Sequence, residues 1–356
     1  MTPAHTAAAA VLMALCGAAS AGAQESAPAR ISADTALSVS MVSSNDHAAG
    51  MFDATVSLDA GKGVTAILRP WAWRRPDGTS TFQWYQLQVR YQTRTRIPVR
   101  IDAGVITSPL GLSTLQQRAD LNPTINPVFY YVIPLPRFDT TFDALQMMSA
   151  GYPLGAMAAT SGAHWDLRGG VTDGTPARPR VELKSDQRPA MPQLVLGGGV
   201  TPRAGMRVGA GFAHGRYRNA TATVPEAHAT VFNLEGEYAF NQTRLSGEWI
   251  MDRFAIASGP VTARSFYLQG VQTITPRLFG AARVSHVLTP PIIFGTERPT
   301  TTYLTMELTA GYRVTRDFTV RGGYYGLRPY HNTEAGVLSE WDHRAAVSVV
   351  WARRWY

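Results

Sequence analysis

Charged side chains recur at every second position of short amphipathic segments in this sequence. In YQLQVRYQ (residues 85–92), glutamines and Arg90 alternate with Tyr85, Leu87, Val89 and Tyr91. Arg100 and Asp102 alternate in the same way with apolar residues between 99 and 106. Fixed charges in rows on a wetted surface can attract, repel and select ions, so electrostatic selection is the chemistry these rows suggest.

The candidate charges occur in equal numbers of the two signs. The basic candidates are Arg90, Arg100, Arg168, Arg207, Arg283, Arg313 and Arg321, and the acidic ones are Asp102, Asp166, Glu235, Glu237, Glu248, Asp252 and Glu307. Two readings stay open. Segments with Arg90, Arg100 and Arg207 could face segments with acidic residues across an enclosed space, or the charges could pair locally, as at Asp166 and Arg168.

No constellation for covalent or metal chemistry accompanies these charges. The sequence has one cysteine, Cys16, no GxSxG, and eight histidines without HxH or HxxxH spacing. The glycines of VGAGFAHG (208–215) do not have dinucleotide-binding spacing. We therefore predict no catalytic residue, no metal site and no cofactor.

The elements that must position the charges are predicted to be β-strands. Alternation over about ten residues is typical of transmembrane β-strands. It occurs around residues 85–92, 99–106, 165–171, 206–213, 232–240 and 303–313. We expect the apolar rows to face lipid, with an aromatic belt that includes Trp84, Tyr85, Tyr91, Trp165, Tyr238, Trp249, Tyr312, Tyr324 and Trp351.

The connections between strands sort by length. Short turns are predicted at 61–63, 93–98, 160–163, 201–205, 241–243, 275–277 and 315–317, and longer, irregular connections alternate with them. Seven short turns and eight long loops connect sixteen strands, with both termini at the short-turn end. The predicted fold is all-β: a transmembrane antiparallel β-barrel of about 16 strands, with short periplasmic turns and long external loops.

Residues 1–23 are predicted to be a signal peptide, and residues 24–356 a single barrel domain. Beyond the leader, no run of about 18 apolar residues could form a spanning helix, so an exported membrane chain must cross with strands. A soluble barrel would bury many unpaired charges at high cost. The net charge of +8 comes mainly from arginines, since Lys62 and Lys184 are the only lysines. These arginines are scattered along the chain and not clustered, which argues against nucleic acid as a partner.

The chain resembles bacterial outer-membrane porins. The resemblance is carried by the strand and loop layout, by the final strand HRAAVSVVWARRWY with its terminal Tyr356, and by VRIDAGVITSPLGL (99–112). The last of these is similar to a strand of the phosphate-selective porin O and P family. Arg354 departs from that family's terminal pattern, and Trp355, Trp351, Val349 and Val347 form the more apolar row.

The resemblance implies a location in the cell outer membrane of a Gram-negative bacterium, among outer-membrane lipids. It also implies assembly by the outer-membrane machinery, homotrimers, and passive diffusion of small hydrophilic solutes or ions. Mild anion preference is expected from the positive net charge. With two lysines in the chain, phosphate selectivity does not follow.

The longest connection, residues 107–148, is the candidate constriction loop. Connections longer than about 15 residues are usually functional or disordered, and the third external loop of general porins folds into the bore. Its charged candidates are Arg118, Asp120, Arg137 and Asp139. The alternative is an outward-lying loop packed on a neighbouring copy.

Two other functions compete with diffusion. An outer-membrane phospholipase or deacylase would need a nucleophile beside a histidine, and His164, His214 and His286 lie near predicted strand ends. A barrel for hydrophobic solutes, or a structural one, is the third candidate. Hydrophobic-solute barrels usually carry an N-terminal plug, and only about ten residues separate Gln24 from the first predicted strand.

Overall fold

The computed structural model describes residues 30–43, 47–107, 110–112, 118–128, 153–173, 192–218, 226–255, 259–288, 302–333 and 336–355. All regular elements in these ranges are β-strands. They are β1 (Arg30–Val42), β2 (Ala49–Gly61), β3 (Val64–Arg74), β4 (Ser80–Gln92), β5 (Val99–Val105), β6 (Leu154–Ser161), β7 (Trp165–Asp173), β8 (Pro192–Arg203), β9 (Met206–Arg218), β10 (Ala227–Phe240), β11 (Thr243–Phe254), β12 (Val261–Thr273), β13 (Leu278–Leu288), β14 (Thr302–Arg313), β15 (Phe318–Thr333), β16 (Gly336–Ser339) and β17 (Asp342–Trp355).

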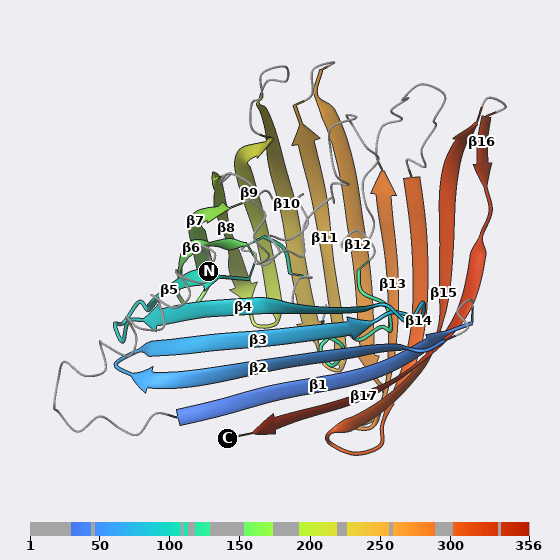
Figure 1. The fold of residues 1–356 in the computed structure, drawn as a ribbon, viewed down its shortest axis with the longest axis horizontal. Coiled ribbons are helices and arrows are strands. Elements are labelled where there is room, and N and C mark those ends of the chain that lie inside the picture. The colour runs from blue at the N-terminus through green and yellow to red at the C-terminus, as the bar shows by residue number, and fades with distance from the viewer. Residues whose placement is uncertain are drawn as a thin grey trace.

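The strands form one closed antiparallel barrel (Figure 1). Strands β1 to β15 each pair with the next strand in sequence, and β17 pairs with β15 and with β1, the latter from Ala33↔Trp355 to Val42↔Ala346. The short β16 and the longer β17 lie along successive parts of β15, so they occupy one position in the wall. The barrel therefore has sixteen strand positions, which confirms the predicted fold.

Short and long connections alternate as predicted except beside β4, where the β3–β4 connection (75–79) has five residues and the β4–β5 connection (93–98) has six. The turn between β2 and β3 consists of Lys62 and Gly63, and the opposite end of each strand leads into a longer connection. Gly63 has φ +83°, and a Cβ at this position would lie 2.2 Å from the carbonyl oxygen of Gln92. Glycine is therefore required there by both the backbone conformation and the close approach of β4.

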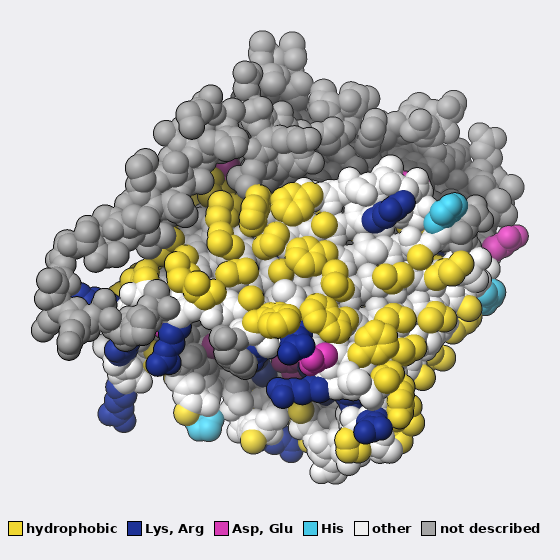
Figure 2. All heavy atoms as spheres, turned by 60° about the horizontal axis from the view of Figure 1, so that its bottom comes forward, with side chains coloured by type: hydrophobic (Ala, Val, Ile, Leu, Met, Phe, Trp, Pro, Cys, Tyr) yellow, Lys and Arg dark blue, Asp and Glu magenta, His cyan; other side chains and the backbone are white. Residues whose placement is uncertain are grey.

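The barrel is apolar outside and largely polar inside. Leu37, Val39, Val347 and Leu308 keep 45–57% of their surface exposed, whereas polar residues of the opposite rows, such as Glu307, are buried. Figure 2 shows the face around β1 and β17, where hydrophobic side chains form a broad band. An apolar outer belt on a closed barrel is the arrangement that lipid requires.

Tyr85 is the exception to the predicted outward row. The pairing of β3 with β4 shifts register between Arg69 and Pro70, so that a β-bulge lies at Tyr85. Its ring stacks on the buried Trp71 at a centroid distance of 4.7 Å, and the Arg69 guanidinium lies 5.3 Å from the ring centre. The extra residue reverses the side to which Tyr85 points, so the prediction that it faces lipid is wrong.

The last strand has the alternative phase considered from the sequence. Val347 and Trp355 are exposed on the outer row, and Arg354 donates to Asp34 Oδ2 at 3.0 Å. Tyr356 and the predicted signal peptide lie outside the described residues. No helix in the described part of the chain is both long and apolar enough to span a membrane.

Candidate functional site in the barrel interior

The chain that follows β5 runs into the barrel. Ile106 and Leu110 are fully buried. A Cβ added to Gly211 of β9 would lie 2.7 Å from Leu110 Cδ2, which places Leu110 against the inner face of that strand. Residues 118–128, which we call the inner segment, contact the β13–β15 side of the wall. The described parts of this connection therefore contact two different sides of the barrel interior.

Glu307 of β14 anchors the inner segment through its carboxylate. Its Oε1 accepts hydrogen bonds from the backbone N–H groups of Ile125 (2.8 Å) and Asn126 (3.0 Å), and from Asn126 Nδ2 (3.2 Å). Its Oε2 accepts from Arg283 Nη2 of β13 at 2.7 Å. Arg283 also donates to the carbonyl oxygen of Pro127 at 3.1 Å, so the pair clamps the end of the segment.

Arg321 of β15 anchors the beginning of the same segment. Its Nη1 donates to the carbonyl oxygens of Ala119 (3.1 Å), Asn122 (2.6 Å) and Thr124 (2.9 Å). Arg321 is 3% exposed and is bound here by neutral oxygens rather than by a carboxylate. Its positive charge is therefore only partly compensated.

Arg118 connects the inner segment to the first strand. Its Nε donates to Asp120 Oδ1 at 2.7 Å, and its Nη2 lies 3.4 Å from Asp34 Oδ1 of β1. The predicted candidates Arg118 and Asp120 thus lie inside the barrel and contact each other. Arg137 and Asp139, the other two loop candidates, lie outside the described residues.

Arg90, Arg100 and Asp102 form a cluster on β4 and β5. Asp102 is 2% exposed and accepts from Arg90 Nε at 2.7 Å, while Arg100 Nε lies 3.0 Å from its other oxygen. Gln88 Nε2 also approaches Asp102, at 3.3 Å. Two arginines share one carboxylate, so this cluster carries a net positive charge.

A second cluster joins β7, β9 and β10. Arg207 donates to Asp166 (2.8 Å) and Glu235 (2.6 Å), and Arg168 donates to the same Glu235 at 3.0 Å. Opposite charges are thus in direct contact both on the adjacent strands β9 and β10 and across the intervening strands between β7 and β9 or β10. In this cluster the charges pair locally, as the second interpretation of the sequence expected, and do not form two opposed walls of charge.

The remaining candidates are placed as follows. Glu237 lies opposite Arg207 in the β9–β10 register, and Glu248 of β11 is buried. Arg313 packs 5.0 Å from the Phe279 ring centre and donates to the Pro276 carbonyl oxygen. Asp252 is fully buried, between Val231 and Ala263 in the register.

Several interior charges were missing from the sequence candidates. Arg69 of β3 and Asp53 of β2 form a buried bidentate pair at 2.6 and 2.8 Å. The inward-facing residues of β3 include Ile67, Arg69 and Trp71. Because Arg69 lies between two apolar residues, this row does not look polar in the sequence. The alternation of Asp53 with apolar residues in β2 is the signal that could have identified the pair.

A cavity of about 590 Å³ lies beside the inner segment, toward the short-turn end. The inner segment contributes Asp120 and Asn122, and the short turns contribute residues 241–242 and 316–317. The charged residues of its lining are Arg244, Arg313, Arg316, Arg321, Asp120 and Asp317. Four arginines against two aspartates give this space an excess of positive charge.

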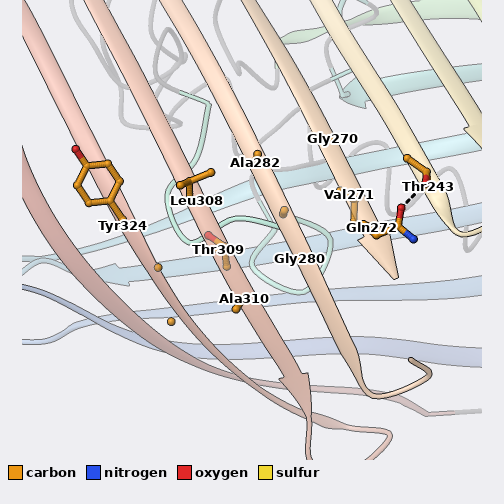
Figure 3. Close-up of a pocket in the computed structure, with 13 residues that line it drawn as sticks. Thr243, Gly270, Val271, Gln272, Gly280, Ala282, Leu308, Thr309, Ala310 and Tyr324 are labelled. Atoms are coloured by element: carbon orange, nitrogen blue, oxygen red, sulfur yellow. Dashed lines mark hydrogen bonds between the residues drawn. The ribbon is translucent and has the colours of Figure 1, made fainter. Parts of the chain in front are cut away.

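A second hollow, of about 650 Å³, lies on the outer face of β12–β15 (Figure 3). Its floor is made of small outward residues such as Gly280, Ala282 and Ala310, with Leu308 and Tyr324 beside them. Thr243 donates a hydrogen bond to Gln272 at its edge. With no charged residue in its lining, it is separate from the charged interior.

Within the described residues, no group of three His, Cys, Asp or Glu side chains could hold a metal ion. Comparison of the sequence finds no matching family model and no matching curated protein. Comparison of the fold finds many solved structures.

Three of these structures show the kind of barrel to which the chain is similar. The anion-selective porin from Comamonas acidovorans is 12% identical with a TM-score of 0.58, and the alignment covers 93% of this chain and 100% of that one. OmpF of Salmonella typhi, in complex with daunomycin, is 10% identical with a TM-score of 0.59, over 91% and 97% of the chains. OmpT of Vibrio cholerae, in a trimer form, is 9% identical with a TM-score of 0.55, over 91% and 99%. The fold of this chain is that of the sixteen-stranded outer-membrane porins.

Proposed function

We propose that this protein is an outer-membrane porin through which small hydrophilic solutes and ions diffuse passively, with a preference for anions. The observation that carries the proposal is the positively charged interior next to the inner segment. Water-filled barrels select ions by the charges that line their narrow parts. The Comamonas porin with a similar fold is itself described as anion-selective, which supports the sign of the preference.

The inner segment is proposed to be the constriction. It is held by Glu307, Arg283 and Arg321 on one side of the barrel, and the preceding chain contacts β9 on another. A solute entering from the long-loop end would pass this segment before it reaches the cavity with four arginines. The clusters around Asp102 and Glu235 belong to the walls along that route.

Arginine would then carry the recognition of anions. The chain has two lysines, and Lys62 lies in a short turn. Whether this arginine-lined bore shares the selectivity of the phosphate-selective family can be tested by asking if phosphate competes with chloride. A block of chloride current by millimolar phosphate would favour that family's selectivity, and unchanged current would argue for general anion preference.

No catalysis is proposed. The hydrolase alternative needs a nucleophile beside a histidine that a third group orients, and the described partners of the three histidines do not provide both. His214 Nδ1 lies 2.9 Å from Thr230 Oγ1 without a carboxylate to orient the ring, and His164 contacts a backbone carbonyl oxygen. We also propose a homotrimer, on the likeness to the trimer form of OmpT, which native mass spectrometry in detergent can test.

The test of the proposal is planar-bilayer recording of the refolded protein in a salt gradient. We expect stepwise conductance and a reversal potential with the sign of anion preference. Folded barrels that insert without conducting would contradict diffusion, and a cation-type reversal potential would contradict the selectivity.

Charge reversal tests where the selectivity arises. Arg244→Glu with Arg316→Glu converts an excess of two positive charges in the cavity lining to an excess of two negative ones, so the reversal potential should move toward cations. Arg100→Glu should move it in the same direction. Arg203→Glu is the matched control, because Arg203 lies over the ring of the outward Tyr238 and should leave the potential unchanged.

A further inference from the structure

Basic side chains gather on the outer face of β9–β13 at the long-loop end. We call Arg216, Arg253, Arg264, His214, His228 and His286 the outer basic belt. All six belong to the outward rows, which they share with apolar residues such as Phe212 and Leu268. They are neighbours across the sheet, since Thr230 pairs with both His214 and Arg253, and Met251 pairs with Arg264.

The depth of the belt is set by its place in the strands. Arg253 is the penultimate residue of β11, and Arg264 is the fourth of the 13 residues of β12. About 9–11 tilted residues are enough to cross the hydrocarbon core. An arginine facing lipid is strongly destabilising at the bilayer midplane and only weakly so near the interface. The belt is therefore placed at the level of the headgroups.

Within the described residues, the two central arginines have no carboxylate beside them. The acidic residue described on this outer rim is Glu226, whose Oε2 lies 3.7 Å from Arg216 Nη1 and whose Oε1 lies 3.2 Å from His228 Nε2. In the described parts of β9–β13 the remaining carboxylates, such as Asp252 and Glu248, are on the inner rows. Arg253 and Arg264 are exposed and extend from a surface that otherwise contacts lipid.

We propose that the outer basic belt binds the phosphate group of a phosphorylated membrane lipid, with Arg253 and Arg264 as its principal contacts. Guanidinium groups bind phosphate oxygens in bidentate geometry. The apolar neighbours in the same rows, such as Phe266 and Leu268, suit the acyl chains of that lipid. The proposal rests on the membrane location that the porin proposal assumes.

The test measures lipid preference by electron paramagnetic resonance, with spin-labelled phosphatidic acid and spin-labelled phosphatidylcholine in phosphatidylcholine vesicles that contain the folded barrel. We expect the wild-type protein to immobilise phosphatidic acid preferentially. Because a basic residue near an anionic headgroup contributes about 1 kcal/mol, each of Arg253→Gln and Arg264→Gln should weaken the preference by about fivefold.

Arg203→Gln is the matched control, since Arg203 is an exposed outer arginine at the opposite end and should keep the preference. Equal association of both lipids with the wild-type barrel, or a preference that survives in the double variant, would overturn the proposal. Conductance of the same samples separates the two proposals. A conducting barrel without lipid preference contradicts only the lipid site, and a lipid-selective barrel without conductance contradicts only the porin.

Discussion

Glu307 shows how much of the interior geometry depends on a single side chain. Its carboxylate binds two backbone N–H groups, one amide side chain and one guanidinium. We expect Glu307→Gln to lower the free energy of unfolding by about 1.5–3 kcal/mol, as hydrogen bonds to a charged group typically contribute that much. Urea unfolding of the refolded barrel in lipid measures the loss.

Glu237→Gln is the control for this change. Glu237 is a half-buried interior glutamate on β10, away from the inner segment, and its replacement should have little effect on stability. Equal stability of Glu307→Gln and the wild type would mean that the anchor contributes nothing measurable.

Tyr85 and Tyr91 provide a second comparison between single residues, because they lie on the same strand but on opposite sides of the wall. Tyr85 stacks on Trp71 in the interior, whereas Tyr91 is 45% exposed on the outer face. Tyr85→Ala should cost about 2–4 kcal/mol through the lost packing and ring contact. Tyr91→Ala should cost less. If Tyr91→Ala lowered the free energy of unfolding more than Tyr85→Ala in the same urea titration, the inward position of Tyr85 would be contradicted.

The inner segment is the element on which the proposed constriction depends. Replacing residues 118–128 by a short Gly-Ser linker removes the backbone that binds Arg283, Glu307 and Arg321. We expect single-channel conductance to rise because the bore becomes wider. The shift in gel mobility on heating, characteristic of folded barrels, serves as the control for folding. Unchanged conductance in a folded variant would place the constriction elsewhere.

The sequence predicted the positions of the strands better than it predicted which side chains of each strand face the interior. Alternation and turn length predicted sixteen strands because lipid outside and water inside impose a period of two on every strand. The bulge at Tyr85 was not predictable, since one extra residue in β4 becomes visible only through its register with β3. The inner rows of β10 and β11 also include the apolar residues Val231 and Ile250, both fully buried. A pattern of polar residues facing a water-filled interior does not predict them.

Across the whole molecule, charge pairing follows from strand order. Arg168, Arg207 and Glu235 stand on separate strands, and contact among them follows from the closure and register of β7–β10. The individual charges were predicted from alternation, but their partners required this register. The position of the inner segment was implied by resemblance alone, because nothing in its residues specifies which side of the wall binds it.

The two lysines of the chain test the orientation of the whole barrel. Lys62 lies in the short β2–β3 turn, and Lys184 is in the long connection between β7 and β8. If short turns face the periplasm, an amine reagent that cannot cross the outer membrane should label Lys184 but not Lys62 in intact cells. Lys184→Arg should then abolish lysine labelling and Lys62→Arg should leave it unchanged, whereas in disrupted cells each variant should show one labelled lysine by peptide mass spectrometry. Labelling of Lys62 in intact cells would mean that the short turns face the cell exterior. The outer basic belt would then lie in the periplasmic leaflet.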